Sequence, residues 1–205
     1  EVYAAAADAF GVLPIPTPEN VPLVIADPYN PRNSYAGSKL MGELLFIHYA
    51  KAYNFRMSIA RLHNVYGPRA GYHPMIPKMI NSIGQRLDPF PLLGPDDVRT
   101  LCFVDDATEA LCRIMESDKT DGQTYHAGDH REVTIKRVVE TLFDILKWGP
   151  KKLDLRDPPE GSPKRSSPDI SKIQRDTGWQ ATVALADGLR KATEWYAAHP
   201  PHRKF

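Results

Sequence analysis

The sequence lacks the features that mark membrane, secreted or nucleic-acid-binding proteins. Its 205 residues contain no signal peptide and no apolar run near the roughly 18 residues of a membrane-spanning helix. The net charge of +1 gives no electrostatic reason for a nucleic-acid or membrane partner. The two cysteines, Cys102 and Cys112, have no metal-ligand spacing, so we expect two buried thiols in a reducing cytoplasm and no bound metal.

Proline is the one unusually frequent residue type, with 19 copies, of which 11 lie in two clusters. One cluster lies over residues 14–31 and the other over residues 150–168. Because proline fixes φ and has no backbone N–H, we expect both segments to be loops with little regular structure.

Apolar periodicity in the remaining chain predicts strands that alternate with helices, which is typical of an α/β fold with a parallel sheet. The predicted strands cover residues 57–62, 100–104 and 123–126, and the predicted helices cover residues 34–53, 77–83, 106–116, 134–147, 169–177 and 185–198. Ser34 and Thr134 are expected to cap two of these helices, and Gly178 is placed to end another. Asp105 or Asp106 is expected as a third cap, with Glu109 completing a capping box.

Tyr35 and Lys39 form a Tyr-x-x-x-Lys pair in the first predicted helix. Residues four apart lie on one face of a helix, and an ammonium group beside a phenol stabilises the phenolate. Such a tyrosine can exchange a proton with a sugar hydroxyl while hydride moves to a nicotinamide. The alternative is an ordinary solvated helix face.

Four segments, taken together, resemble the NAD-dependent epimerase/dehydratase family of extended short-chain dehydrogenase/reductases. NPRNSYAGSK (residues 30–39) is similar to that family's active-site helix, and ARLHNVYGPR (60–69) to its next strand and turn. VRTLCFVDD (98–106) and RSSPDISK through GW (165–179) resemble two later signatures, in the same order. The resemblance covers nearly the whole chain and implies an enzyme that acts on nucleotide sugars.

The family fold implies that residues 1–70 and 106–128 form the second half of a Rossmann-like, doubly wound parallel sheet. Residues 71–105 and 129–205 would then form a smaller α/β substrate-binding lobe. The resemblance implies that Tyr35 is the catalytic acid/base and that Lys39 binds the nicotinamide ribose and tunes Tyr35, with Leu62 also at the cofactor.

The same resemblance places Asn64, Arg99 and Arg165 at the substrate. Asn64 would contact the sugar or its diphosphate, although an Asx turn is an equal alternative. Arg99 and Arg165 would converge on the diphosphate on the Tyr35 side, since a guanidinium fork suits that anion; the alternative for each is a surface arginine. The segment 90–93 would lie beside the nucleotide base or contribute to the core. His63 is expected to serve in packing.

Glu1 stands where related dehydratases, decarboxylases and 3,5-epimerases carry an acid/base group. A carboxylate there can remove the C5 proton of a 4-keto sugar, because the carbonyl makes that proton acidic. A structural acid at a strand end is the alternative. Glu1 is therefore a candidate catalytic residue that leaves dehydration open.

The glycine-rich turn that holds a dinucleotide pyrophosphate is missing, because the 13 glycines never adopt the Gly-x-x-Gly-x-x-Gly spacing. We therefore expect a C-terminal part, inactive by itself, of a protein with roughly one hundred further residues. The whole protein is interpreted as a homodimeric, cytoplasmic NAD- or NADP-dependent nucleotide-sugar epimerase with a 4-keto intermediate. A 4,6-dehydratase or uronate decarboxylase is the alternative, and a non-catalytic NAD(P)-binding sensor or scaffold is the rival of another class.

Overall fold

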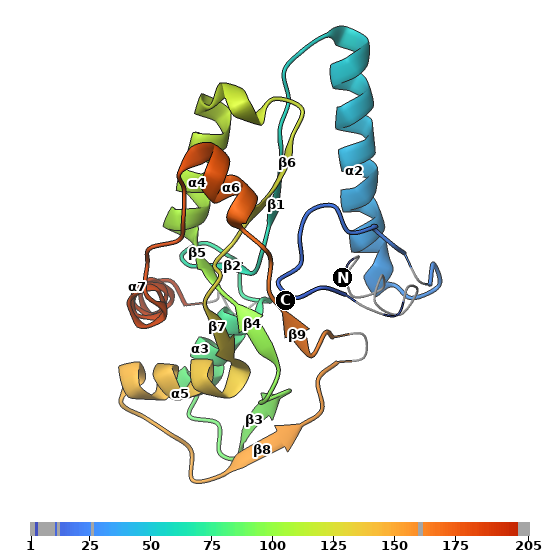
Figure 1. The fold of residues 1–205 in the computed structure, drawn as a ribbon. Coiled ribbons are helices and arrows are strands. Elements are labelled where there is room, and N and C mark those ends of the chain that lie inside the picture. The colour runs from blue at the N-terminus through green and yellow to red at the C-terminus, as the bar shows by residue number, and fades with distance from the viewer. Residues whose placement is uncertain (1–2, 4–10, 12, 26, 160–161, 201–205) are drawn as a thin grey trace.

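A computed structural model of the chain describes residues 3, 11, 13–25, 27–159 and 162–200. It confirms the predicted α/β class, with short and mainly parallel strands (Figure 1). The strands are β1 (Ile59–Leu62), β2 (Val65–Tyr66), β3 (Phe90–Leu93), β4 (Val98–Thr100), β5 (Cys102–Phe103), β6 (Thr124–Ala127), β7 (Glu132–Thr134), β8 (Leu153–Arg156) and β9 (Arg165–Ser166). The helices are α2 (Arg32–Tyr53), α3 (Met75–Gly84), α4 (Val104–Glu116), α5 (Ile135–Leu146), α6 (Ser171–Thr177) and α7 (Leu185–Ala198), with a short 3-10 turn, η1 (Asp118–Thr120).

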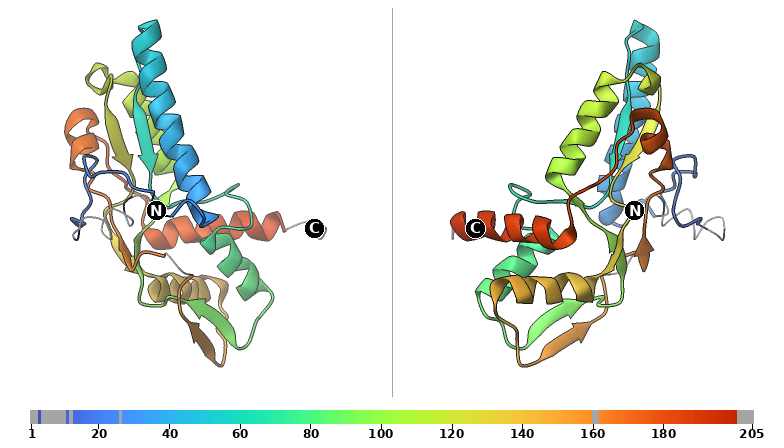
Figure 2. Two further views of the ribbon diagram at one scale, coloured as in Figure 1. Left: turned by 90° about the vertical axis from the view of Figure 1, so that its right-hand side faces the viewer. Right: turned by 60° about the vertical axis from the view of Figure 1, so that its left-hand side comes forward.

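The parallel pair β1–β6 lies between α2 on one side and α4 with α6 on the other (Figures 1 and 2). Side chains alternate along β1, so Ala60 packs into the cluster formed with α4 and α6 while its neighbour Arg61 bonds to α2. The buried members of that cluster are Cys102, Ala107, Ala110, Ile114, Tyr125, Ala127, Ile170, Ile173, Trp179 and Ala181. Strand β1 therefore connects this cluster to the helix that carries Tyr35.

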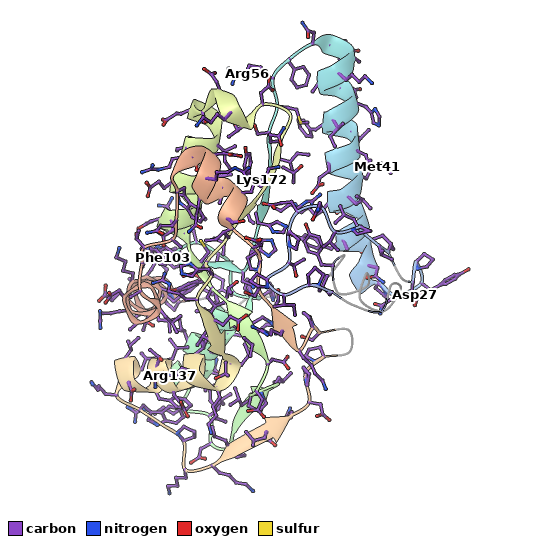
Figure 3. All side chains as sticks on the ribbon, in the orientation of Figure 1. Asp27, Met41, Arg56, Phe103, Arg137 and Lys172 are labelled. Atoms are coloured by element: carbon purple, nitrogen blue, oxygen red, sulfur yellow. The ribbon has the colours of Figure 1, made fainter. Side chains whose placement is uncertain are left out.

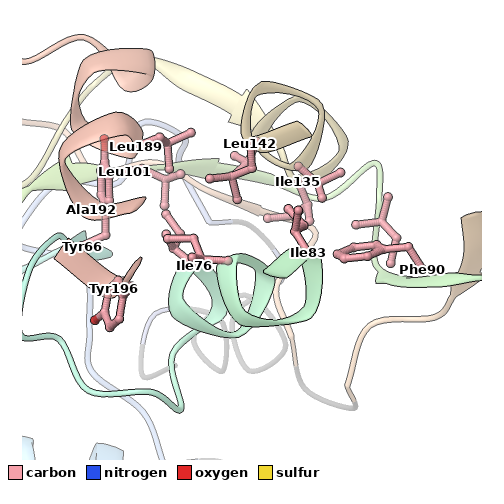
Figure 4. Packing of buried hydrophobic residues seen from close by; sticks show 14 of the residues in the cluster. Tyr66, Ile76, Ile83, Phe90, Leu101, Ile135, Leu142, Leu189, Ala192 and Tyr196 are labelled. Atoms are coloured by element: carbon pink, nitrogen blue, oxygen red, sulfur yellow. The ribbon is translucent and has the colours of Figure 1, made fainter. Parts of the chain in front are cut away.

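A larger core lies among α3, α5, α7 and the strands β2, β3 and β5 (Figure 4). Helix α5 buries Ile135, Val138, Val139 and Leu142, which follow the i, i+3, i+4, i+7 spacing of one helix face. Burying each such side chain stabilises the fold by about 1.5–3 kcal/mol. The predicted division into residues 1–70 with 106–128 and residues 71–105 with 129–205 remains a prediction. Helix α6, which that division assigns to the substrate-binding lobe, packs against β6 and α4.

Local signals in the sequence predict the ends of three helices, and two of the three predictions are confirmed. The Thr134 hydroxyl caps α5 by accepting from the Arg137 N–H at 3.1 Å, as predicted. Gly178 ends α6 in the left-handed conformation at φ 69°, also as predicted. Ser34 as a cap is wrong, because α2 already begins at Arg32 and the Ser34 hydroxyl donates to the Pro31 carbonyl.

The predicted aspartate cap and capping box of α4 are also wrong. This helix begins at Val104 without a side-chain cap. The buried Asp106 carboxylate instead accepts bonds from Thr182 and from the Val183 N–H, at 3.0–3.1 Å. Glu109 pairs with Arg113 one turn along the helix. Tertiary partners have therefore displaced the local ones.

The proline-rich segments differ from each other. Residues 13–25 and 27–31 are irregular apart from a bridge between Thr17 and Pro168. The second segment contains β8 and β9, so the prediction of little regular structure is wrong there, because β3 and β4 supply distant pairing partners. The prediction of two buried cysteines holds for Cys102 but is wrong for Cys112, which is exposed.

Among the residues that the structure describes, no helix combines the length and the apolar character that crossing a membrane requires. The same residues contain no group of three or more His, Cys, Asp and Glu side chains arranged to hold a metal ion.

Candidate active site

Tyr35 and Lys39 lie together near the start of α2. The Lys39 Nζ atom is 5.4 Å from the centroid of the Tyr35 ring, as the four-residue spacing predicts. Tyr35 is 64% exposed, so its hydroxyl group is open to a ligand. A side chain added at Gly37, between the two residues, would meet nothing within 4 Å, so this part of the helix can be approached closely.

A cleft of about 510 Å³ collects most of the predicted site residues. Its walls include Tyr35, Lys39, Leu62, Asn64 and Arg165. These residues come from α2, the end of β1 and β9, which are distant in the sequence. The structure therefore places Tyr35 and Lys39 in one cleft with the predicted cofactor residue and two predicted substrate residues. Their binding roles remain predictions.

Asn64 occupies the boundary between this cleft and a second cleft of about 560 Å³, because it lines both. Its backbone has a positive φ of 43°, and its amide nitrogen donates to the Thr100 carbonyl at 2.9 Å. The side chain thus connects the end of β1 to β4.

Arg99 lines the second cleft. Its Nη2 atom donates to Asp97 at 3.1 Å and to the Ser162 hydroxyl at 3.0 Å, and its side chain is 13% exposed. Pro91 and Leu93 line the same cleft, whereas Leu92 is fully buried in the core. Leu92 therefore belongs to the core. That Pro91 and Leu93 contact the nucleotide base stays a prediction.

The structure does not show the expected convergence of Arg99 and Arg165. Arg165 donates to both carboxylate oxygens of Glu132 at 2.9 Å, which lowers the pKa of Glu132. In the parallel β4–β9 pair, Arg165 is opposite Val98, so Arg99, one residue later, projects from the other face. The two guanidinium groups accordingly line different clefts, and the prediction that they share one is wrong for this conformation.

A partly buried polar network that sequence reasoning missed lies in the wall of the Tyr35 cleft. Arg61 donates from Nε and Nη2 to the two carboxylate oxygens of Glu43, at 2.8 and 2.7 Å. Its Nη1 atom donates to the Tyr3 hydroxyl and to the Glu19 carbonyl, and the Tyr3 hydroxyl also bonds to His126 Nε2 at 2.7 Å. The available signal was an arginine inside an apolar strand pattern, since a cation that is largely removed from water requires partners.

His63 lies beside this network. Burial and then the neighbouring His126 lower the pKa of His63 to about 3, so the ring is neutral near pH 7. Its Nε2 atom is buried and has no hydrogen-bond partner among the described residues. A packing role fits this environment, as expected. Glu1, the remaining candidate, lies outside the described residues.

The known proteins that this chain resembles agree with one another on its family. The family model described as GDP-mannose 4,6 dehydratase matches residues 3–192. A dTDP-glucose 4,6-dehydratase from Neisseria gonorrhoeae is 30% identical over 191 residues, which are 86% of this chain and 54% of that protein. UDP-glucuronic acid decarboxylase 6 from Arabidopsis thaliana is 30% identical over 166 residues, which are 80% of this chain and 47% of that protein. The chain spans about half the length of these curated relatives.

Solved structures agree on the fold. A dTDP-glucose 4,6-dehydratase from Streptomyces venezuelae with NAD bound superposes with a TM-score of 0.77 at 26% identity, covering 92% of this chain and 56% of that one. A UDP-glucose 4-epimerase from Thermotoga maritima gives 0.78 at 24% identity, covering 91% and 59%, which shows the shared fold alone. Because the family match extends over residues 3–192, this chain belongs to the NAD-dependent epimerase/dehydratase family.

Proposed function

We propose that this chain supplies the acid/base and substrate-binding side chains of an NAD(P)-dependent enzyme that oxidises a nucleotide-linked sugar at C4. The observation that carries the proposal is the Tyr35–Lys39 pair, exposed in a cleft that adjoins a second cleft at Asn64. The names of the relatives, which include dehydratases and a decarboxylase of nucleotide sugars, support it.

The chemistry follows from the position of the phenol. The Tyr35 phenolate accepts the proton of the C4 hydroxyl, while the Lys39 ammonium stabilises the negative charge. A bound nicotinamide would accept the hydride from C4, which leaves a ketone. Tyr35, Lys39 and Leu62 fit its nicotinamide end, because they line an open cleft and Gly37 permits close approach.

The two clefts suit a ligand with two unlike ends. The sugar would lie in the Tyr35 cleft, and the nucleotide would extend past Asn64 toward Pro91 and Leu93. Arg165 would approach the diphosphate from the first cleft and Arg99 from the second. Each arginine would have to exchange a carboxylate partner for phosphate oxygens.

The fate of the 4-keto sugar separates three activities. The sequence led us to expect epimerisation, in which the ketone is reduced again on its other face. Curated relatives near 30% identity support 4,6-dehydration more directly, since epimerase structures such as those from Thermotoga maritima and Bacillus cereus are 24% and 23% identical. We therefore propose loss of water from the intermediate as the main outcome, with epimerisation and decarboxylation as the alternatives.

Turnover of nucleotide sugars by the whole protein tests the proposal. Tyr35→Phe keeps the ring but removes the ionisable hydroxyl, so turnover should fall at least about 10²-fold while cofactor binding survives. Near wild-type turnover would exclude Tyr35 as the acid/base. The absence of turnover in the wild-type protein, with NAD still bound, would favour the sensor or scaffold. Mass spectrometry of the product separates loss of water, loss of carbon dioxide and no change in mass.

We also propose that the whole protein is a homodimer. Met41, which is labelled in Figure 3, and Phe46 are apolar side chains on α2 that are more than half exposed and would be covered by a second copy. Light scattering on the whole protein tests this, and a monomeric mass at micromolar concentration would contradict it.

A further inference from the structure

Helix α2 contacts the rest of the described chain along a narrow seam. Ala36 and Ala50 are its only buried residues among those whose burial the structure describes. Glu43 lies midway between them, and its side chain is 18% exposed. Seven residues correspond to nearly two helical turns, so Ala36, Glu43 and Ala50 occupy one face. Ala36 and Ala50 contribute only apolar packing to this seam, so the polar contact in it is made by the Glu43 carboxylate.

Arg61 holds that carboxylate from β1. Its two-point ion pair with Glu43 leaves the arginine side chain only 16% exposed. The Tyr3 hydroxyl and the Glu19 carbonyl accept from the third nitrogen, so the guanidinium group is fixed from the opposite side as well. The Glu43 carboxylate consequently has one well-defined orientation, toward the strand.

Glu43 is also one turn beyond Lys39 on α2. A lysine and a glutamate four residues apart on a helix can pair with each other. In the structure Lys39 lies over the Tyr35 ring while Glu43 is held by Arg61. Two cations, Lys39 and Arg61, thus lie within reach of one carboxylate, and only the arginine binds it.

We propose that Arg61 is a positioning residue which, by holding Glu43 in a two-point ion pair, keeps this carboxylate from neutralising Lys39 and leaves the ammonium group available to Tyr35. The inference rests on the proposed function, because it concerns the same acid/base pair. Arg61 acts through Glu43 and Lys39, without itself touching the reacting atoms.

Other charged or titratable groups face the same cleft from neighbouring elements. They are Tyr3, His63 and Arg165. His63 is neutral because its pKa is about 3, and Arg165 is paired with Glu132. Burial, opposed by Arg61, raises the pKa of Tyr3, so its hydroxyl stays neutral. Among the described residues that line the cleft, Glu43 is the carboxylate able to compete for Lys39.

The test is the pH dependence of turnover in the whole protein. If Arg61→Met releases Glu43 toward Lys39, the phenolate of Tyr35 forms less readily, and the midpoint of the rise in rate with pH should move upward by about one unit or more. Adding Glu43→Gln removes the competing charge, so the double variant should return the midpoint to the wild-type value. Arg131→Met is a matched control, because it breaks a partly buried ion pair with Asp129 but lines neither cleft, and its midpoint should not move.

An unchanged midpoint in Arg61→Met, or a shift that persists in the double variant, would overturn the inference and leave Arg61 with a purely structural role. If Arg61→Met does not fold, Arg61→Lys keeps the cation but loses the two-point geometry; a smaller upward shift supports the inference and an unmoved midpoint overturns it. Tyr35→Phe separates this inference from the proposed function. Retained turnover in that variant defeats both, whereas lost turnover with a fixed midpoint in the Arg61 variants defeats only this one.

Discussion

Mild acid should destabilise this protein through His63, which lines the Tyr35 cleft. Its ring meets that of His126 edge-on, with centroids 4.5 Å apart, and lies 6.4 Å from the ring of Tyr3. Its buried Nε2 atom has no hydrogen-bond partner in the described part of the chain. Burial, followed by repulsion from His126, lowers the pKa of His63 from 6.5 to about 3.

The magnitude follows from proton linkage. The unfolded chain binds a proton at His63 below about pH 6.5, whereas the folded protein does so only near pH 3. Protons therefore favour the unfolded state between these values, so the stability is complete above pH 6.5 and declines as the pH falls toward 3. Each pKa unit is worth about 1.36 kcal/mol, and pH 5.0 lies about 1.5 units below the unfolded value. The loss at pH 5.0 is therefore about 2 kcal/mol from His63 alone.

Urea unfolding at about pH 7.5 and pH 5.0 measures this loss. His63→Leu removes the titrating ring, so its loss of unfolding free energy between the two pH values should be about 2 kcal/mol smaller than that of the wild type. His48→Gln, at an exposed position on α2, is the control and should behave like the wild type. Equal losses in the wild type and His63→Leu would refute the reasoning.

Further predictions concern packing and binding. Asp106→Ala should lower the free energy of unfolding by about 3–5 kcal/mol, measured by urea unfolding, because two backbone N–H groups and a hydroxyl lose their acceptor; a loss under about 1 kcal/mol would contradict this. Gly188→Ala should cost about 1–3 kcal/mol in the same assay, since the added Cβ would overlap the Tyr66 side chain. Arg99→Ala or Arg165→Ala in the whole protein should weaken nucleotide-sugar binding by about 1.5–3 kcal/mol by calorimetry, and unchanged affinity would remove that arginine from the site. Titration of the 205-residue chain with NAD and NADP should show no tight binding; a low-micromolar dissociation constant would show that the missing glycine turn is not required.

Features with local causes could be predicted from the sequence. Helix α7 has the predicted bounds, Leu185–Ala198, because its apolar spacing is regular. The Thr134 cap and the Gly178 terminus were also predicted, since a cap and a left-handed glycine act within one helical turn. The meeting of Tyr35 with Lys39 has the same local origin.

Features that depend on distant partners could not be predicted. Asp106 stands where the sequence predicts a helix cap. Its carboxylate instead accepts from Thr182 and Val183, and no local pattern reveals those donors. Arg99 and Arg165 project from opposite faces of the sheet because of the β4–β9 pairing register. If that register shifted by one residue, both would project from the same face. The resemblance suggested that both arginines line one cleft, whereas the pairing of the strands decides which way each side chain projects.

The apolar character of α2 has a consequence for the whole protein. Leu44, Leu45 and Phe46 are consecutive and are 44%, 52% and 63% exposed. Successive helical residues point about 100° apart, so these side chains face three directions and no single packing surface can cover them all. This chain matches about half the length of its relatives. In a protein of their length, either additional residues of the same chain or a second copy could cover these side chains. Amide hydrogen exchange in α2 should therefore be fast in the 205-residue chain and slow in the whole protein. Slow exchange in the shorter chain would show that the seam of Ala36, Glu43 and Ala50 holds α2 in place without further partners.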